Sequence, residues 1–157
     1  MVDLNEKYWP FLQNLLKNGV FEIRNCACLS MVKFLKVNYY EKKRLEIVKH
    51  VNEHFFKSKS YFLRMVYLEF VAFSLVFFSQ TFLKLHIIPD CFKLASDRVP
   101  NVRRKLASIM VNLNKRIDKS DEENMAKFKE TLAIFKKDID LDVSDVTFPK
   151  NPSFLNS

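Results

Sequence analysis

An arginine recurs at nearly constant spacing along the chain. Arg24, Arg64 and Arg103 lie 40 and 39 residues apart, and each directly follows an apolar residue. Six positions before each arginine is a polar residue of a type that favours a helix N-cap, namely Asn18, Ser58 and Asp97. The stretches "NLLKNGVFEIR", "HFFKSKSYFLR" and "KLASDRVPNVR" therefore represent three versions of one unit. A period near 40 built from two helices is typical of an α-solenoid.

Apolar residues spaced by three and four predict helices through most of the chain. We expect an all-α, armadillo-like superhelix of three helix pairs and part of a fourth, over residues 6–37, 41–79, 81–117 and 120–139. The third pair opens with one helix from Thr81 to Ala95, and Ser120 with Glu123 predicts a capping box. Residues 140–157 are expected to be a disordered tail or a truncated repeat.

The composition excludes several other classes of protein. Nearly half of the 157 residues are apolar, which excludes wholesale disorder. There is one glycine, Gly19, whereas β-hairpins and phosphate-binding loops need several. No nucleophile paired with a base and no set of metal ligands is evident, so we expect neither an enzyme nor a cofactor.

The cysteines and histidines indicate a reduced chain without a metal site. Cys26, Cys28 and Cys91 are odd in number and lack zinc-site spacing, which favours a cytoplasmic protein. His50 and His54 lie four apart on a predicted helix and could share a metal, but a solvated helix face is the preferred interpretation. The opening residues do not predict a signal peptide, and the most apolar run, residues 70–83, is too short to cross a membrane.

The stretch "DRVPNVRRKLASIM" resembles the opening of the second helix of a HEAT repeat. In that family an Asp and an Arg six residues apart form a hydrogen-bonded ladder between adjacent repeats, and Asp97 and Arg103 match both positions. The resemblance extends the ladder to Arg24 and Arg64, although Asn18 and Ser58 stand where the Asp would be. The fold it implies is an α-solenoid of HEAT-type helix pairs.

The resemblance can be narrowed within the HEAT family. "KSKSYFLRMVYLEF" and "LHIIPDCFKLASDRVPNVRRKLASIM" are similar to successive repeats in the scaffold subunit of protein phosphatase 2A. They resemble more closely the family of regulatory subunit 4 of protein phosphatase 4. "FKKDIDLDVSDV" resembles the opening of that family's next second helix, so the similarity covers roughly residues 6–146 of a chain much shorter than those proteins.

The resemblance implies a non-catalytic regulatory or scaffold subunit of a Ser/Thr protein phosphatase. Its partner would be a catalytic subunit of the phosphatase 4 or 2A type, or another protein, and neither nucleic acid nor a membrane is expected. In the resembled scaffolds, the ridge of turns between paired helices contacts the catalytic subunit. The matching candidates here are Asn18, Lys57, Lys59, Asp97, Arg98, Asn101 and Arg104.

An alternative is a binder of nucleic acid or of acidic proteins. The formal net charge is +8, which raises the expectation of an anionic partner. The residues of such a basic face would be Lys42, Lys43, Arg44, Arg103, Arg104 and Lys105. A structural role for Arg103 in the ladder weakens this alternative.

Overall fold

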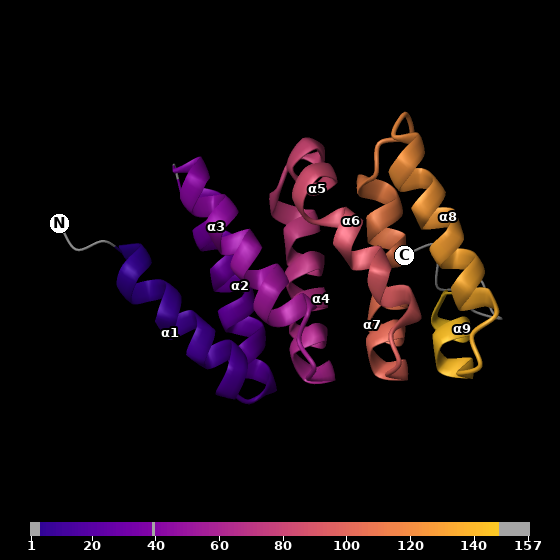
Figure 1. Ribbon diagram of the computed structural model, residues 1–157, viewed down its shortest axis with the longest axis horizontal. Coiled ribbons are helices and arrows are strands. Elements are labelled where there is room, and N and C mark those ends of the chain that lie inside the picture. Colours follow the sequence, from indigo (N-terminus) through magenta and orange to yellow (C-terminus); the bar gives the residue numbers. More distant parts are fainter. Residues whose placement is uncertain (1–3, 39, 148–157) are drawn as a thin grey trace. The chain divides into compact units, whose positions relative to one another are not determined.

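The structure is a computed structural model, and it describes residues 4–38 and 40–147. These residues form helices joined by short turns, without a strand among them, so the prediction of an all-α chain is confirmed for this part. None of the described helices is long and apolar enough to cross a membrane. Figure 1 labels the helices in chain order. The chain divides into two compact units, residues 1–79 and 80–157, each of which is considered by itself.

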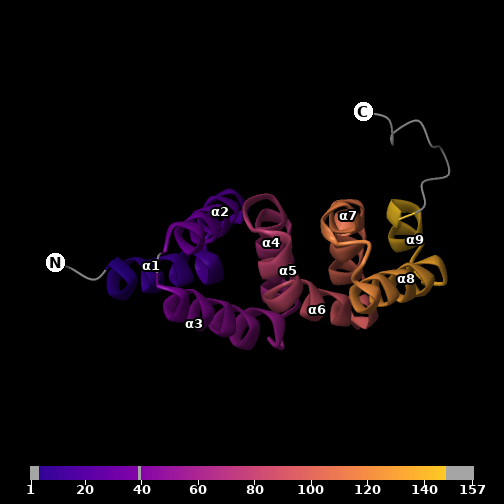
Figure 2. The same ribbon diagram turned by 90° about the horizontal axis from the view of Figure 1, so that it is seen from above.

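The first unit contains two helix pairs. Helix α1 (Leu4–Asn18) packs on α2 (Phe21–Val37), and α2 packs on α4 (Tyr61–Phe77). Between α2 and α4 the chain forms α3 (Glu41–Val51), which continues into a short π-helical turn, η1 (Asn52–Phe56), that contacts α4. Figure 2 shows α2 and α4 side by side.

The core of the first unit is formed by the apolar stripes of these helices. Five of its fully buried side chains are Leu16, Val32, Leu35, Tyr67 and Phe70. They come from α1, α2 and α4, as the three- and four-residue spacing of apolar positions predicts. Burying such side chains from water is the main favourable contribution to the stability of this unit.

The second unit opens with three short helical segments in place of the single helix predicted over 81–95. These are α5 (Gln80–His86), α6 (Ile88–Cys91) and the 3₁₀ turn η2 (Phe92–Ser96). Ile87 lies between the first two with φ −120° and ψ −54°, outside the helical region. Pro89 follows at the start of α6, where it has no N–H to donate and its ring blocks the preceding turn. The prediction of one continuous helix was therefore wrong.

Two long helices and one short helix complete the second unit. They are α7 (Pro100–Arg116), α8 (Glu122–Lys136) and α9 (Leu141–Thr147). Helix α7 packs on η2, α8 and α9, and α8 also contacts η2 and α9. The fully buried side chains include Val102, Leu106, Leu113, Phe135 and Val143, so α9 contributes to the core through Val143.

The start of α8 differs from the predicted capping box. Asp121 is the N-cap, and its carboxylate accepts hydrogen bonds from Asn124 N (3.3 Å) and Asn124 Nδ2 (2.7 Å). Both hydrogen bonds lower the pKa of the Asp121 carboxyl, and the one from the Asn124 side chain has the larger effect. Ser120 instead hydrogen-bonds to Asp118, and Glu123 pairs with Lys127, so the predicted pairing of Ser120 with Glu123 was wrong.

The structure extends the helical part of the chain past residue 140. Residues Leu141–Thr147 are helical and pack on α7 and α8. Residues 148–157 of the predicted tail lie outside the described residues. The packing of α1 on α2 and of α8 on α9 is consistent with a helical repeat, while one continuous superhelix of HEAT repeats remains a prediction.

Candidate binding surfaces at the turns between paired helices

The recurring arginine is bonded to the turn that precedes its own helix. Arg24 Nη1 donates to Gly19 O at 2.8 Å, Arg64 Nη1 donates to Ser58 O at 2.8 Å, and Arg103 Nη1 donates to Asp97 O at 2.7 Å. In each pair the acceptor is a main-chain carbonyl just after the first helix, where carbonyls lack intrahelical partners. A hydrogen bond from a charged donor is stronger than a neutral one, so these contacts hold the turns in place.

The polar residues six positions before each arginine do not occupy the N-cap positions. The N-caps of α2, α4 and α7 are Val20, Ser60 and Val99, so that prediction was wrong. Asp97 lies two residues earlier, and its Oδ1 accepts from Val99 N at 2.9 Å. Ser58 Oγ accepts from Ser60 N in the same manner at 3.2 Å. These side chains therefore stabilise the turn before the helix, as Asx and Ser/Thr turns do.

Arg103 also joins two successive helix pairs of the second unit. Its Nε and Nη2 donate to the two carboxylate oxygens of Asp138 at 2.7 and 2.8 Å. The Arg103 side chain is 15% exposed and that of Asp138 is 5% exposed. The hydrogen bonds from Arg103 lower the pKa of Asp138, and the same pairing raises the pKa of Arg103. This bidentate pair ties α7 to the turn between α8 and α9.

Asp138 is the equivalent of Asp97 in the next helix pair. It lies 41 residues further along the chain, and its Oδ1 accepts from Asp140 N at 2.9 Å, as Asp97 does from Val99 N. Asp138 was not among the predicted ladder residues, although the 40-residue period points to it. The ladder of Arg24, Arg64, Asp97 and Arg103 remains a prediction, and in this structure the carboxylate that pairs with Arg103 belongs to Asp138.

In the first unit the contact between pairs has a different form. The guanidinium of Arg24 lies over the ring of Phe62, 3.9 Å from the ring centroid. Such a cation–π contact links the first turn of α2 to the first turn of α4. Arg64, one of the ladder candidates, is 7% exposed and donates to Lys59 O as well as to Ser58 O.

The first unit presents an apolar and basic surface at its turns. We call Asn18, Val20, Phe21, Lys57, Lys59 and Tyr61 the turn surface of the first unit. All six residues are exposed. The exposed fraction is 61% for Phe21 and 48% for Tyr61. Phe21 and Tyr61 are the first residues of α2 and α4, and the Arg24–Phe62 contact holds these two helix starts together. The two lysines and Asn18 were predicted from the sequence as partner-binding residues, whereas Phe21 and Tyr61 were not.

The second unit has its own turn surface. Arg98 and Asn101 are exposed and Asp97 is half-buried. A shallow, open pocket of about 480 Å³ is lined in part by Asp97, Arg103 and Asp138. Arg104 pairs with Asp142 at 3.3 Å, with both side chains more than half exposed. Predicted partner-binding residues thus lie on the turns or in the helix that follows them in both units, and their role stays a prediction.

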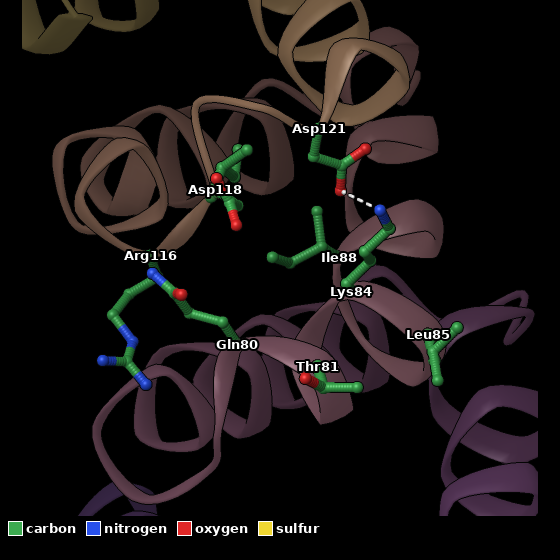
Figure 3. Close-up of a pocket in the computed structure, with 9 residues that line it drawn as sticks. Gln80, Thr81, Lys84, Leu85, Ile88, Arg116, Asp118 and Asp121 are labelled. Carbon is green, nitrogen blue, oxygen red and sulfur yellow. Dashed lines mark ion pairs between the residues drawn. The ribbon is translucent and has the colours of Figure 1, made fainter.

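A second cavity of about 380 Å³ lies elsewhere in the second unit, between α5 and the turn before α8 (Figure 3). Lys84 points across it and pairs with Asp121 at 3.3 Å (Figure 3). Arg116 and Asp118 also line it, so charges of both signs are present. Because Asp121 caps α8 and Asp118 accepts from Ser120 N, these carboxylates have structural roles.

The histidine pair lies at the contact of α1 with α3 and η1. The rings of His50 and His54 have centroids 4.0 Å apart, and His50 Nε2 lies 2.9 Å from Gln13 Nε2. Trp9 meets the His50 ring edge-on, so His50 is part of a packed contact rather than of a solvated face. Burial, with a contribution from His54, lowers the pKa of His50. Within the described residues, no group of three or more His, Cys, Asp or Glu could hold a metal ion.

The basic face considered as an alternative is divided between the two units. Lys42, Lys43 and Arg44 belong to the first unit, whereas the other candidates belong to the second. In the second unit Arg103 and Arg104 pair with Asp138 and Asp142. Pairing reduces the positive charge that these two arginines offer to a nucleic-acid backbone.

Comparison with known proteins gives a distant similarity. No protein-family model matches the chain. Two curated proteins, both named serine/threonine-protein phosphatase 4 regulatory subunit 4, from human and mouse, are each 26% identical to it over 114 residues. The similarity covers 70% of this chain but only 13% of either relative. The chain thus resembles a short part of a phosphatase regulatory subunit.

Proposed function

We propose that the chain is a non-catalytic regulatory or scaffold subunit of a Ser/Thr protein phosphatase of the phosphatase 4 or 2A type. The observation that carries this proposal is its 26% identity to regulatory subunit 4 of phosphatase 4. The helical pairs with exposed turns are compatible with such a role, since helical repeat proteins bind partners on extended surfaces. A cytoplasmic location belongs to the same proposal.

The turn surface of the first unit is the proposed docking site for the catalytic subunit. Aromatic side chains contribute large contact area at low entropic cost, and Phe21 and Tyr61 are both about half exposed or more. The arginine contacts to the turn carbonyls hold the main chain in a fixed conformation, which reduces the ordering cost of binding. Lys57 and Lys59 add positive charge that attracts carboxylates of the partner.

The experiment is a binding titration of the whole chain against purified phosphatase 4 and 2A catalytic subunits by biolayer interferometry. The double variant Phe21→Ser and Tyr61→Ser should weaken binding at least about tenfold, because exposed aromatic residues dominate interface energies. Phe11→Ser is the matched control, since Phe11 is 55% exposed on α1, away from the turn. Absence of binding to both catalytic subunits would refute the proposal.

We do not include direct binding of nucleic acid in this proposal. The two arginines that a nucleic-acid face would need in the second unit are paired with Asp138 and Asp142. The test is a titration with single- and double-stranded oligonucleotides. Binding whose affinity falls steeply between low and physiological salt would support the nucleic-acid alternative.

A further inference from the structure

A second basic and apolar surface lies at the opposite ends of α2 and α4 from the turn surface. We call Lys33, Lys36, Val37, Tyr40, Lys42 and Val76 the edge surface of the first unit. Val37, Tyr40 and Val76 are 66%, 74% and 73% exposed, and the three lysines are exposed as well. None of these residues was among the candidates for partner binding at the turns.

Sequence spacing and contacts place Lys33, Lys36, Val37 and Tyr40 around the end of α2 and the turn that follows it. Lys33 and Val37 are four residues apart on α2, so they share one face of the helix. Tyr40 is the N-cap of α3, and its N–H is bonded to the side chain of Asn38 at 3.1 Å, which fixes the turn that joins α2 to α3. Lys36 Nζ lies 5.8 Å from the centroid of the Phe78 ring, which places the end of α4 beside the end of α2.

Positive charge is concentrated along this edge. Residues 33–43 include four lysines, Lys33, Lys36, Lys42 and Lys43, and one acidic residue, Glu41. The positive charge of Lys43 is offset by Glu46, whose Oε2 lies 3.2 Å from Lys43 Nζ. The remaining lysines share this short segment with the exposed Val37 and Tyr40, so a complementary partner carries carboxylates next to apolar side chains.

The chemistry of the edge favours a protein segment over other anionic partners. Lysines can also contact phosphates, but base recognition uses arginine forks and stacked aromatic residues, whereas this edge adds two exposed valines and one tyrosine to its lysines. Peripheral membrane binding uses a long apolar helix face, and here the apolar residues come from the ends of three different helices. We propose that the edge surface binds an acidic segment of a partner protein, with apolar side chains between its carboxylates.

This surface is independent of the turn surface. Helix α2 has 17 residues, so its two ends are about 25 Å apart at 1.5 Å per residue. A short acidic segment bound at the edge therefore leaves the turn surface open to a catalytic subunit. The inference does not rest on the phosphatase proposal, and the variants below separate the two.

The test uses the whole chain and a fluorescent peptide of repeated Glu-Glu-Leu-Glu-Glu-Phe sequence, followed by fluorescence anisotropy. The double variant Lys33→Glu and Lys42→Glu should weaken binding of this peptide at least about tenfold. The double variant Lys57→Glu and Lys59→Glu makes the same change of net charge at the turn surface and should leave peptide binding within about twofold. The reverse pattern is expected for binding of the phosphatase catalytic subunit.

A matched tyrosine pair tests the apolar part of the surface. Tyr40→Ala should weaken peptide binding about threefold or more, and Tyr61→Ala should not, since only Tyr40 lies on the edge. Circular dichroism melting checks that each variant is folded. Equal weakening by both lysine double variants would overturn the proposal. So would a peptide that fails to bind, or preferential binding of an oligonucleotide or of phosphatidylserine vesicles at the edge.

Discussion

Replacing Arg103 with alanine should destabilise the second unit far more than replacing its neighbour Arg104. Arg103 donates three hydrogen bonds, one to Asp97 O and two to the carboxylate of Asp138, and its side chain is 15% exposed. Arg104 makes one contact with Asp142 at 3.3 Å, and its side chain is 54% exposed. The two variants remove the same side chain from adjacent positions of α7, so each is a control for the other.

The magnitude follows from what each truncation leaves behind. Arg103→Ala leaves the nearly buried Asp138 carboxylate without its guanidinium, which costs about 2–3 kcal/mol for a charged hydrogen-bonded pair of this kind. Arg104→Ala removes an exposed ion pair, which contributes about 0–1 kcal/mol. For a unit of this size, the larger loss corresponds to a fall in melting temperature of roughly 10 °C or more.

Thermal and urea denaturation followed by circular dichroism at 222 nm measure this difference. The pH dependence gives a second check, because the folded-state pKa of Asp138 is lowered by Arg103. The contribution of the pair is therefore complete above about pH 4 and is lost as the pH falls toward the folded-state pKa. The difference in unfolding free energy between the wild type and Arg103→Ala should therefore become smaller in acid. Equal midpoints for Arg103→Ala and Arg104→Ala at pH 7 would refute the reasoning.

Three further predictions concern the cap, the turn and the thiols. Asp121→Ala should lower the free energy of unfolding by about 1–2 kcal/mol and Ser120→Ala by much less, since Asp121 caps α8; equal urea midpoints would argue for the capping box. Gly19→Ala should cost about 1–3 kcal/mol by urea denaturation, because its Cβ would lie 2.6 Å from a main-chain oxygen of α1, and an unchanged midpoint would contradict that close approach. Cys26 is exposed, whereas burial of Cys91 raises the pKa of its thiol, so Ellman's reagent should label Cys26 rapidly and Cys91 only on unfolding; equally fast labelling of both would contradict their placement.

The helices were predictable because their apolar residues recur at helical spacing. The stripes from α1, α2 and α4 close the core of the first unit, with Leu16, Val32 and Phe70 fully buried. The sequence also indicated the turns, because the spacing of Arg24, Arg64 and Arg103 marks the first turn of each second helix. The apolar spacing and the arginine spacing both repeat over many residues, so they remain detectable despite local exceptions.

Local features were harder to predict. The break at Ile87 depends on how Pro89 disturbs one helical turn, and apolar periodicity continues through it. Ser58 and Asp97 are good N-cap types, but the chain uses them two residues earlier, where they bond to the N–H of the cap residue. Side-chain identity alone does not distinguish these two positions.

The candidate surfaces were only partly predictable. The lysines of the turn surface followed from their position in the repeat, whereas Phe21 and Tyr61 have the apolar character of core residues. Only the packing shows that the first residue of each second helix points to solvent. Asp138 could have been found, because it repeats Asp97 after 41 residues, but it lies just before the segment interpreted as a possible tail.

Hydrogen exchange measured by mass spectrometry tests the central claim most directly. The whole chain is compared alone and in the presence of a purified phosphatase 4 catalytic subunit. The account predicts slower exchange on binding in residues 18–24 and 57–64, which include the turn surface of the first unit, with little change in residues 33–44 at the edge surface. Unchanged exchange at these turns with a saturating catalytic subunit, or protection confined to the edge, would contradict it.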